Sequence, residues 1–341
     1  MKAKLQSKLY LDKRSRLEEV IPLETPYLLY LDPASTCNFQ CSFCPTHLQA
    51  RSAKKVMDYE LFTKVMDDLN EFDEPLKVLR MNKIGEPLIN KRMVDMVKYA
   101  RQSGRVLHID TTTNASLLNP EMITGLIDAG LDRMNISIEG VNEAQYLEIA
   151  KARINFENLV NTIKWLYQHK KQCEITIKVP GEYLSDQDKQ TFFDVFGDHC
   201  DRIFIEELSP IWPEFDEMNG LGQSDAEAER QGQYKQTNTE KEICTYIFYA
   251  MVINADGTVS ACCPDWDQKL IIGNSRTQSL KEIWNSKAMN DLRRLHLQMR
   301  RRENPVCGAC GHIKTSQVDN IDDYHDVLSK KFEAYEQNLP S

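Results

Sequence analysis

The 341-residue sequence predicts an α/β protein: a partial (β/α)6 TIM-type barrel followed by a small C-terminal β-hairpin and helix. Two patterns predict this fold. From residue 27 onward, six short apolar or β-branched runs alternate with amphipathic stretches of helical period. Repeated βα units of this kind form a parallel sheet with right-handed crossovers. Later in the chain, two apolar runs flank Asp256-Gly257, a dipeptide typical of a tight hairpin turn.

The expected strands cover residues 27–32, 76–82, 106–110, 133–138, 174–179 and 202–205. The expected helices begin near residues with capping chemistry, namely Asp58, Asn90, Pro120, Asn155 and Ser185. Another helix is expected over residues 280–302, with a buried stripe made of Leu280, Ile283, Trp284, Leu292 and Leu295. In sheets of this type the functional residues gather at the carboxyl ends of the strands.

Composition divides the chain into five segments. They are an N-terminal extension (1–25), the barrel core (26–210), a linker (211–240), a cysteine-containing C-terminal domain (241–315) and a charged tail (316–341). The linker is assigned because residues 210–238 are rich in Trp, Pro, Gly, Gln and acidic residues and show little periodicity. The three arginines at 300–302 are interpreted as the end of a helix, where cations suit the helix dipole.

Charge and cysteine content restrict the class of protein. The 42 Lys and Arg residues against 51 Asp and Glu give a net charge of −9, which argues against a nucleic-acid backbone as the general partner. The N-terminus has no apolar core of signal-peptide type, and no apolar stretch is long enough to span a bilayer. We therefore expect a cytoplasmic protein with neither a nucleic acid nor a membrane as partner. In that compartment ten cysteines favour metal binding over disulfides.

Cys37, Cys41 and Cys44 form a Cys-x3-Cys-x2-Cys motif directly after the first expected strand. A four-iron cubane normally takes one thiolate per iron, so three cysteines leave one iron open for a small chelating ligand. The alternatives are a zinc site completed by His47, or three core cysteines that bind no metal.

With the aromatic Phe43 before its last cysteine, the motif resembles the hallmark of the radical S-adenosylmethionine (SAM) superfamily. The resemblance implies a [4Fe-4S] cluster whose open iron is chelated by SAM, and a reductant such as flavodoxin or ferredoxin as protein partner. The reduced cluster would cleave SAM to a 5′-deoxyadenosyl radical, which abstracts hydrogen from a C–H bond. The implied SAM contacts are Gly85 and Glu86 at the amino group, Asn114 and Ser137 at the ribose and carboxylate, and Phe43 and Val179 beside the adenine.

Four later cysteines suffice for a second [4Fe-4S] cluster with no open iron: Cys244, Cys262, Cys307 and Cys310. Their order around the hairpin and helix, with spacings of 18, 45 and 3 residues, resembles the twitch (SPASM-like) domain of 2-deoxy-scyllo-inosamine dehydrogenases. The shorter twitch form matches better than a full SPASM domain, because no cysteine follows Cys310. A zinc ribbon with the same ligands is the alternative. Cys173 and Cys200 are interpreted as core residues.

The resemblance implies a radical SAM oxidoreductase that acts on a small polar substrate, carbohydrate-like or cyclitol-like. Hydrogen abstraction from a hydroxyl-bearing carbon, followed by transfer of an electron to the auxiliary cluster, would produce a ketone. The candidate substrate residues lie after expected strands and are Arg153, Glu206, Glu207 and Trp212. Each of them also has a simpler explanation, as an exposed loop charge or an ordinary packed tryptophan.

Cys263 favours a different reaction. Neighbouring strand residues point to opposite faces, so Cys263 is not expected to be a cluster ligand beside Cys262. A thiol near a substrate radical can return a hydrogen atom from the opposite face, which would make the protein a radical epimerase. The simpler interpretation of Cys263 is a small buried hydrophobe.

Two further hypotheses stay open. The protein could be a peptide-modifying SPASM enzyme, although only about 25 residues precede the core, few for a peptide-recognition domain. A non-enzyme hypothesis is an iron–sulfur electron carrier or a zinc-binding interaction protein.

Overall fold

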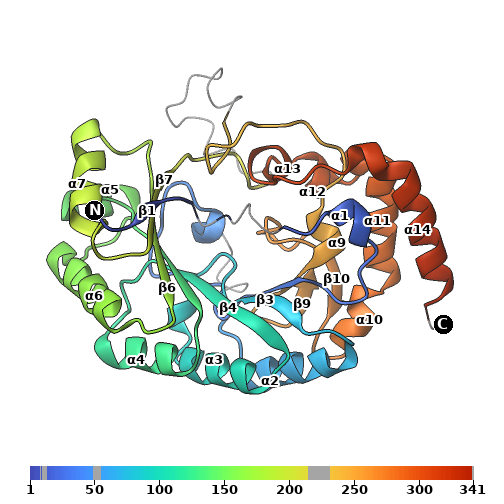
Figure 1. Cartoon of the computed structure of the whole chain (residues 1–341), viewed down its shortest axis with the longest axis horizontal. Helices are drawn as coiled ribbons and strands as arrows, with labels where there is room; N and C mark the ends of the chain where they lie inside the picture. The colour runs from blue at the N-terminus through green and yellow to red at the C-terminus, as the bar shows by residue number, and fades with distance from the viewer. Residues whose placement is uncertain (8, 10–13, 49–54, 214–230, 340–341) are drawn as a thin grey trace.

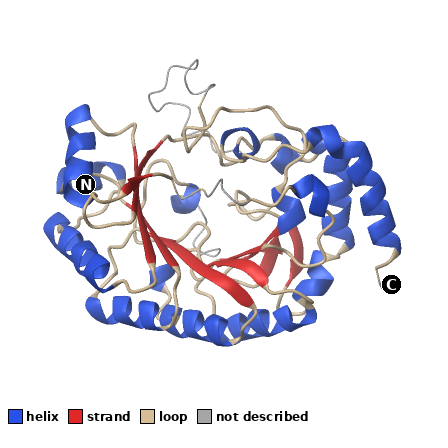
Figure 2. Ribbon diagram, in the orientation of Figure 1, coloured by secondary structure: helices blue, strands red, loops and turns tan. Residues whose placement is uncertain are grey.

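The computed structural model describes residues 1–7, 9, 14–48, 55–213 and 231–339. Within these ranges the strands form one ten-stranded sheet in the order β1-β7-β6-β5-β4-β3-β2-β8-β9-β10. The six predicted barrel strands are present: β2 (Leu28–Leu31), β3 (Leu76–Arg80), β4 (Val106–Thr113), β5 (Arg133–Ser137), β6 (Glu174–Pro180) and β7 (Arg202–Glu206). Neighbouring strands of this set are parallel, and the sheet curves with helices along its outer side (Figures 1 and 2). The predicted fold class is confirmed.

The helices of the barrel are α2 (Tyr59–Asp68), α3 (Met93–Gln102), α4 (Pro120–Asp128), α5 (Glu143–Ile149), α6 (Phe156–His169) and α7 (Asp186–Phe196), preceded by the short α1 (Leu17–Val20). The predicted caps Asp58, Asn155 and Ser185 each accept a backbone N–H with the side chain. Single 3-10 turns are η1 (Pro45–His47), η3 (Leu69–Glu71) and η4 (Pro87–Ile89). The helix α5 was not predicted, because seven residues show too little periodicity.

Asn90 does not cap a helix, as the sequence suggested. The helix α3 begins at Met93, and the buried Asn90 amide donates instead to the carbonyl groups of Pro33 and Met57, both 3.0 Å away. Asn90 therefore ties two loops on the carboxyl side of the sheet together.

Segments from outside the predicted core extend the sheet at both edges. The strand β1 (Lys4–Leu5) pairs in parallel with β7, so residues 1–25 are more than an extension. On the other edge β8 (Ala250–Ile253) pairs in parallel with β2, and β9 (Thr258–Ser260) and β10 (Ile271–Asn274) follow as antiparallel strands. The predicted hairpin is confirmed: Gly257 has a φ of 96°, which glycine adopts readily, in the turn between β8 and β9. The C-terminal domain thus continues the barrel sheet.

The predicted helix over residues 280–302 is broken. It consists of α10 (Leu280–Trp284), α11 (Lys287–Leu297) and the 3-10 turn η6 (Arg301–Glu303). The side chain of Ser286 caps α11 and starts a new helix with a shifted phase. Leu297 is therefore buried, whereas Leu295 of the predicted stripe is only half-buried.

The last segment packs against the molecule and is not a separate tail. It contains α12 (Pro305–Gly308), α13 (His312–Thr315), η7 (Asp322–Tyr324) and α14 (His325–Gln337), while α9 (Tyr246–Tyr249) precedes β8. Phe332 of α14 is buried edge-to-face against Phe248, with ring centroids 6.5 Å apart. No helix in the described part of the chain is both long and apolar enough to cross a membrane.

The barrel strands separate two environments. Residues such as Ile109, Ile136 and Ile177 are fully buried in the apolar core that includes the outer helices. The alternate residues, such as Tyr30, Arg80 and Asp110, face the inside of the curved sheet and are mostly polar. The apolar face fixes the fold, and the polar face is available for chemistry.

Candidate active site

The loop after β2 places the first three cysteines at the carboxyl end of the sheet: Cys37, Cys41 and Cys44. Two backbone hydrogen bonds to the end of α5 hold this loop, from Gln40 N to Ala150 O and from Ser42 N to Ile149 O. The hydroxyl oxygen of Thr46 lies 3.0 Å from Cys44 Sγ, and the same hydroxyl donates a hydrogen bond to the carbonyl of Ile84.

Burial controls the protonation of the three thiols. It raises the pKa of Cys37 to about 12 and also raises the pKa of Cys41 and of Cys44. At neutral pH the sulfurs are therefore thiols until a positively charged centre replaces their protons. Iron–sulfur clusters are held by cysteine thiolates, so the donor set fits a cluster.

Gly85 lies directly against the cysteine loop. A Cβ atom at position 85 would lie 1.8 Å from the carbonyl oxygen of Ala34 and 2.6 Å from that of Thr36. The next residue, Glu86, donates its backbone N–H to the same oxygen of Thr36 at 2.9 Å. The absence of a side chain at Gly85 therefore lets the loop after β3 touch the loop after β2.

We expect Gly85→Ala to displace the cysteine loop, because the added atom meets backbone that cannot rotate away. The substitution should lower the free energy of unfolding by about 1–3 kcal/mol and reduce the iron bound by the first three cysteines. Urea denaturation and iron analysis measure the two effects. Gly125→Ala in α4 is the control, since its Cβ would meet only the side chain of Val94, at 3.0 Å. Full iron content in Gly85→Ala would contradict the role assigned to this glycine.

Glu86 is buried, and its carboxylate joins the loop after β3 to the end of β4. One oxygen accepts from Leu88 N and from the Thr113 hydroxyl, and the other accepts from Asn114 N at 2.8 Å. Desolvation raises the pKa of Glu86 to about 7, although these donors favour the charged form. The side chain and the backbone N–H and carbonyl of Glu86 are thus engaged within the protein, and the predicted SAM contact of this residue remains a prediction.

Asn114 and Ser137 end neighbouring strands. The Asn114 amide donates to Asn38 Oδ1 at 2.9 Å and lies 3.9 Å from Cys37 Sγ, so this residue adjoins the cysteine loop. Ser137 is half-buried at the end of β5. Their contacts with SAM remain predictions.

The two residues expected beside the adenine are in different environments. The Phe43 ring lies 5.9 Å from the ring of Tyr183, whose hydroxyl is 3.0 Å from Ser42 Oγ. Val179 is fully buried in the apolar core with Ile177, and its contact with the adenine remains a prediction. Strand residues alternate, and position 179 falls on the helix side. Tyr183 was missed because its loop has no periodic pattern.

The four later cysteines line one cavity: Cys244 before α9, Cys262 after β9, Cys307 in α12 and Cys310 after it. Its remaining wall is formed by Pro213, Ile247, His296, Arg301, Val306 and Ile313. Burial raises the pKa of all four thiols, that of Cys310 to about 12. Four thiols around one cavity supply the thiolate donors that a closed iron–sulfur cluster takes, and a zinc ion takes the same donors.

Arg301 corrects the interpretation of the arginines at 300–302 as a simple helix end. It is buried, lines the four-cysteine cavity and donates to the carbonyl groups of Lys241 and Cys307. Its guanidinium also lies 3.7 Å from a carboxylate oxygen of Glu242. The exposed Arg302 bonds the same carboxylate, at 3.0 Å. Arg301 is thus part of the auxiliary site.

Cys262 and Cys263 lie in different environments. Cys262 lines the four-cysteine cavity, whereas Cys263 packs against the cluster of inner-face residues that contains Tyr30 of β2 and Val252 of β8. Tyr246 stacks on Tyr30 in the same region, with ring centroids 6.5 Å apart. The thiol of Cys263 therefore lies on the side of the barrel interior. The expected strand alternation is not the reason, because β9 ends at Ser260 and both cysteines lie in the loop after it.

A charged layer crosses the inner face of the barrel and was not predicted. Arg80 forms two hydrogen bonds of 2.8 Å with Asp110 and a third, of 3.2 Å, with the Tyr30 hydroxyl. On the other side Arg133 donates to Glu174 at 3.1 Å, and Glu174 also pairs with Arg202. The strand registers place these residues opposite one another, so the layer follows from the pairing of strands far apart in the sequence.

Asp32 and Lys83 lie at the carboxyl side of this layer and are also new candidates. Both carboxylate oxygens of Asp32 are buried without a hydrogen-bond partner among the described residues. Burial raises the pKa of Asp32 to about 7, against the opposing effect of Lys83. Lys83 donates to Asn254 Oδ1 at 2.6 Å and to the carbonyl of Asp265 at 2.9 Å, and burial lowers its pKa. Lys83 therefore links the barrel to the auxiliary domain.

The four predicted substrate residues do not form one group. Glu206 is buried at the end of β7, where it pairs with Lys178 on the inner face. Glu207 pairs with Lys235 at 3.5 Å, and Trp212 is half-buried. Arg153 is exposed in a groove of about 450 Å³ that also contains Asn38. Arg153 and Glu206 therefore belong to different surfaces.

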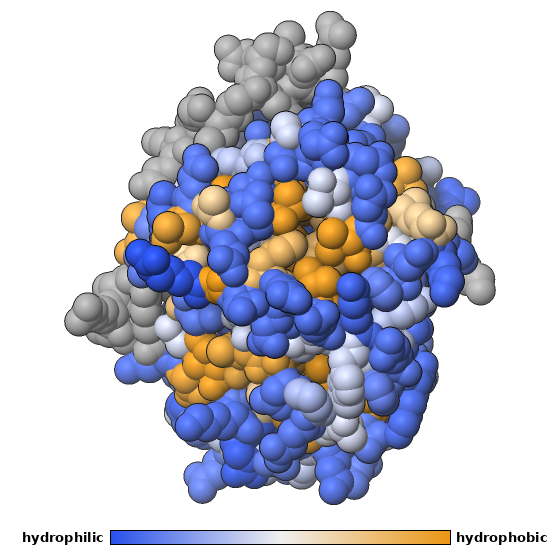
Figure 3. All heavy atoms as spheres, turned by 90° about the vertical axis from the view of Figure 1, so that its left-hand side faces the viewer, coloured by the Kyte–Doolittle hydropathy of each residue, from blue (hydrophilic) through white to orange (hydrophobic). Residues whose placement is uncertain are grey.

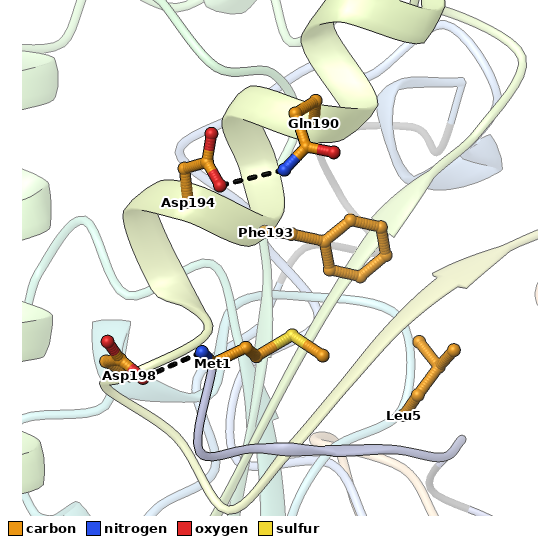
Figure 4. Close-up of a pocket in the computed structure, with 6 residues that line it drawn as sticks. All are labelled: Met1, Leu5, Gln190, Phe193, Asp194 and Asp198. Atoms are coloured by element: carbon orange, nitrogen blue, oxygen red, sulfur yellow. Dashed lines mark hydrogen bonds and ion pairs between the residues drawn. The ribbon is translucent and has the colours of Figure 1, made fainter.

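A second groove, of about 480 Å³, lies away from all predicted site residues. It separates β1 from α7, and its wall includes the exposed Met1 and Leu5 (Figure 4). The N-terminal amine lies 3.4 Å from Asp198, and Gln190 donates to Asp194 (Figure 4). The molecular face on this side has apolar patches separated by hydrophilic atoms (Figure 3). Among the described residues of the groove, no set of side chains is grouped to bind a metal ion.

Comparison with known proteins agrees with this arrangement. Residues 32–190 match the radical SAM superfamily, and residues 244–311 match SPASM, an iron-sulfur cluster-binding domain. The first range contains the cysteine triad and the second contains the other four predicted ligands. Each cysteine set therefore lies in a range that matches a family of iron–sulfur proteins, the triad in the radical SAM match and the later four in the SPASM match.

Solved structures show the same fold. BtrN, in complex with AdoMet and 2-DOIA, superposes with a TM-score of 0.56 at 18% identity, over 87% of this chain and 97% of BtrN. SuiB of Streptococcus suis, bound to its precursor peptide SuiA, has a TM-score of 0.57 at 13% identity, over 88% of this chain and 72% of SuiB. At these identities the likeness concerns the fold alone.

Curated relatives differ in their activities. The tungsten-containing aldehyde ferredoxin oxidoreductase cofactor-modifying protein of Pyrococcus furiosus is 30% identical over 54% of this chain and 52% of its own length. The PqqA peptide cyclase of Bradyrhizobium diazoefficiens is 30% identical over 41% of this chain and 36% of its own length. The AdoMet-dependent heme synthase of Methanosarcina barkeri is 24% identical over 79% of this chain and 85% of its own length. The chain thus matches about half of the length of the Pyrococcus protein and about a third of the length of the peptide cyclase.

Proposed function

We propose that the protein oxidises a small polar, carbohydrate-like or cyclitol-like substrate inside the barrel and transfers an electron to an auxiliary [4Fe-4S] cluster. The observation that carries the proposal is the inner face of the sheet, which presents charged and hydroxyl side chains such as those of Arg80, Asp110 and Tyr30. A short segment connects the two sites: Lys83 bonds the auxiliary domain, and Glu86 bonds the triad loop. A polar substrate suits this lining, because buried polar groups need hydrogen-bond partners.

When bound, SAM and the two clusters would supply hydrogen abstraction by a 5′-deoxyadenosyl radical and a one-electron acceptor. The residues of the chain would orient the substrate and accept its proton. Asp32 suits the second role, because both of its buried oxygens lack a hydrogen-bond partner among the described residues and its pKa of about 7 is near the working pH. Loss of one hydrogen atom, one proton and one electron converts a secondary alcohol into a ketone. A flavodoxin or ferredoxin would supply the electron that cleaves SAM.

A radical epimerase is the second candidate, and the position of Cys263 supports it. A thiol that packs with Tyr30 on the inner face could donate its hydrogen atom to a substrate radical from the side opposite to SAM. The resulting thiyl radical would need one electron and one proton from the reductant before the next turnover. The structural likeness to SuiB, solved with a precursor peptide, keeps a peptide substrate as an alternative.

The test uses full-length protein that has been reconstituted with iron and sulfide without oxygen. We expect about eight irons per chain and release of 5′-deoxyadenosine on addition of dithionite and SAM. Aminocyclitols, amino sugars and short peptides are then offered in deuterated water. A product two hydrogens lighter without solvent deuterium supports oxidation, whereas an isomer with one deuterium supports epimerisation. A colourless protein that contains zinc and leaves SAM intact would refute both reactions.

A further inference from the structure

The wall of the four-cysteine cavity contains hydrogen-bond donors that the cysteine pattern did not predict. Gln317 donates from its amide nitrogen to Cys244 Sγ at 2.9 Å. The orientation of this amide is set by its oxygen, which accepts from the backbone N–H and the hydroxyl of Thr245, at 3.2 and 3.1 Å. Gln317 is buried, and its nitrogen therefore points at the sulfur.

His296 supplies a second donor. The backbone N–H of Cys244 donates to His296 Nδ1 at 3.0 Å, so Nδ1 carries a lone pair and the ring proton is on Nε2. The side chain is fully buried and lines the cavity, and Nε2 has no hydrogen-bond partner among the described residues. A buried N–H group without a partner is costly, so its presence indicates an acceptor that occupies the cavity.

Arg301 adds positive charge on the same wall. Its guanidinium donates to the carbonyl of the ligand Cys307 at 2.5 Å. The carboxylate of Glu242 compensates this charge only in part, because Glu242 lies closer to Arg302 than to Arg301. The three side chains come from α11, from η6 and from the segment after α13; His296 and Arg301 line the cavity, and Gln317 reaches it through its hydrogen bond to Cys244 Sγ.

We infer that Gln317, His296 and Arg301 raise the reduction potential of the auxiliary cluster by stabilising its reduced, more negative form. Hydrogen bonds to cluster sulfur and nearby positive charge are recognised means of setting the potential of such clusters. Hydrogen-bond donors of this kind favour transfer of an electron to the auxiliary cluster, as the proposed oxidation of the substrate requires. The inference rests on the proposed function, because it requires that iron and not zinc occupies the four cysteines.

The experiment measures the midpoint potential of each cluster in full-length reconstituted protein by EPR-monitored redox titration. His296→Leu and Gln317→Glu should each lower the ratio of reduced to oxidised auxiliary cluster about tenfold at a fixed potential, a shift of about 59 mV for a one-electron couple. The potential of the first cluster should stay unchanged and is the internal control. Titration in a Cys37→Ala/Cys41→Ala/Cys44→Ala background removes any overlap of the two signals.

Two further variants separate hydrogen bonding from structure and from net charge. His296→Gln keeps an N–H donor and should restore most of the midpoint potential. Gln298→Glu adds the same charge as Gln317→Glu at an exposed position after α11 and should cause no shift.

A direct spectroscopic test does not depend on variants. In protein labelled with ¹⁵N-histidine, pulsed EPR of the reduced auxiliary cluster should detect an imidazole nitrogen and an exchangeable proton. Two results would overturn the inference and leave the proposed function intact. One is the absence of this coupling in the wild-type protein. The other is an unchanged midpoint potential of the auxiliary cluster in His296→Leu and Gln317→Glu when both variants keep their full iron content. Zinc in the four-cysteine site would instead contradict the proposed function.

Discussion

Alanine at any one of the three triad positions should abolish the release of 5′-deoxyadenosine. Cys37→Ala, Cys41→Ala and Cys44→Ala each leave two thiolates, too few to hold a four-iron cluster with one open site. Activity should fall more than about a hundredfold, because even second-shell substitutions at metal sites cost about 10–100-fold. Iron should fall from about eight to about four per chain, and the auxiliary cluster should persist. Iron analysis and chromatography of 5′-deoxyadenosine measure the two effects.

Cys173→Ala is the matched control for this series. Cys173 is fully buried before β6 in the apolar core, distant in the fold from both cysteine sites. Its replacement should leave the iron content and SAM cleavage unchanged and lower stability by about 1 kcal/mol. Continued SAM cleavage in any triad variant would show that the cluster is held elsewhere.

The neighbours Cys262 and Cys263 should give opposite results when replaced. Cys262→Ala removes one of the four thiols around the auxiliary cavity and should reduce iron from about eight to about four per chain, while SAM cleavage continues. Product formation should then stop in an oxidation reaction, because the substrate radical has lost its electron acceptor. Cys263→Ala should keep all the iron, since this residue packs with Tyr30 and Val252 on the inner face.

The two variants form a matched pair, because they remove the same atom from adjacent positions. Turnover retained in Cys263→Ala supports oxidation. Turnover lost with continued release of 5′-deoxyadenosine supports epimerisation, since the radical then forms but receives no hydrogen atom. Iron lost in Cys263→Ala would contradict the separation of the two thiols that the structure shows.

The local sequence pattern was sufficient to predict the fold class and the proximity of the three cysteines of the triad. The alternation of apolar runs with amphipathic helices predicts the parallel sheet, because secondary structure follows from neighbouring residues. Cys37, Cys41 and Cys44 occupy one short loop, so their proximity follows from covalent distance alone. The hairpin at Asp256-Gly257 has the same local origin, since a glycine with positive φ closes it.

The helix break at Ser286 shows where local pattern stops. Leu295 was expected in a buried stripe of one long helix, but the cap at Ser286 begins a new helix, in which Leu292 and Leu297 are buried and Leu295 is half-buried. The burial of Val179 in the apolar core with Ile177 was likewise not predicted. Which side chains a helix or strand buries depends on the elements packed against it.

The sequence by itself thus determined the fold class and the strand order along the chain, and it predicted two sets of cysteine ligands. Only the tertiary structure brought together the charged layer around Arg80, the buried pair Asp32 and Lys83, and the side chains of Gln317 and His296 beside Cys244. Their partners lie tens to hundreds of residues apart, and Gln317 and Cys244, for example, are separated by 73 positions. Such contacts depend on strand pairing and helix packing, which local sequence periodicity does not predict.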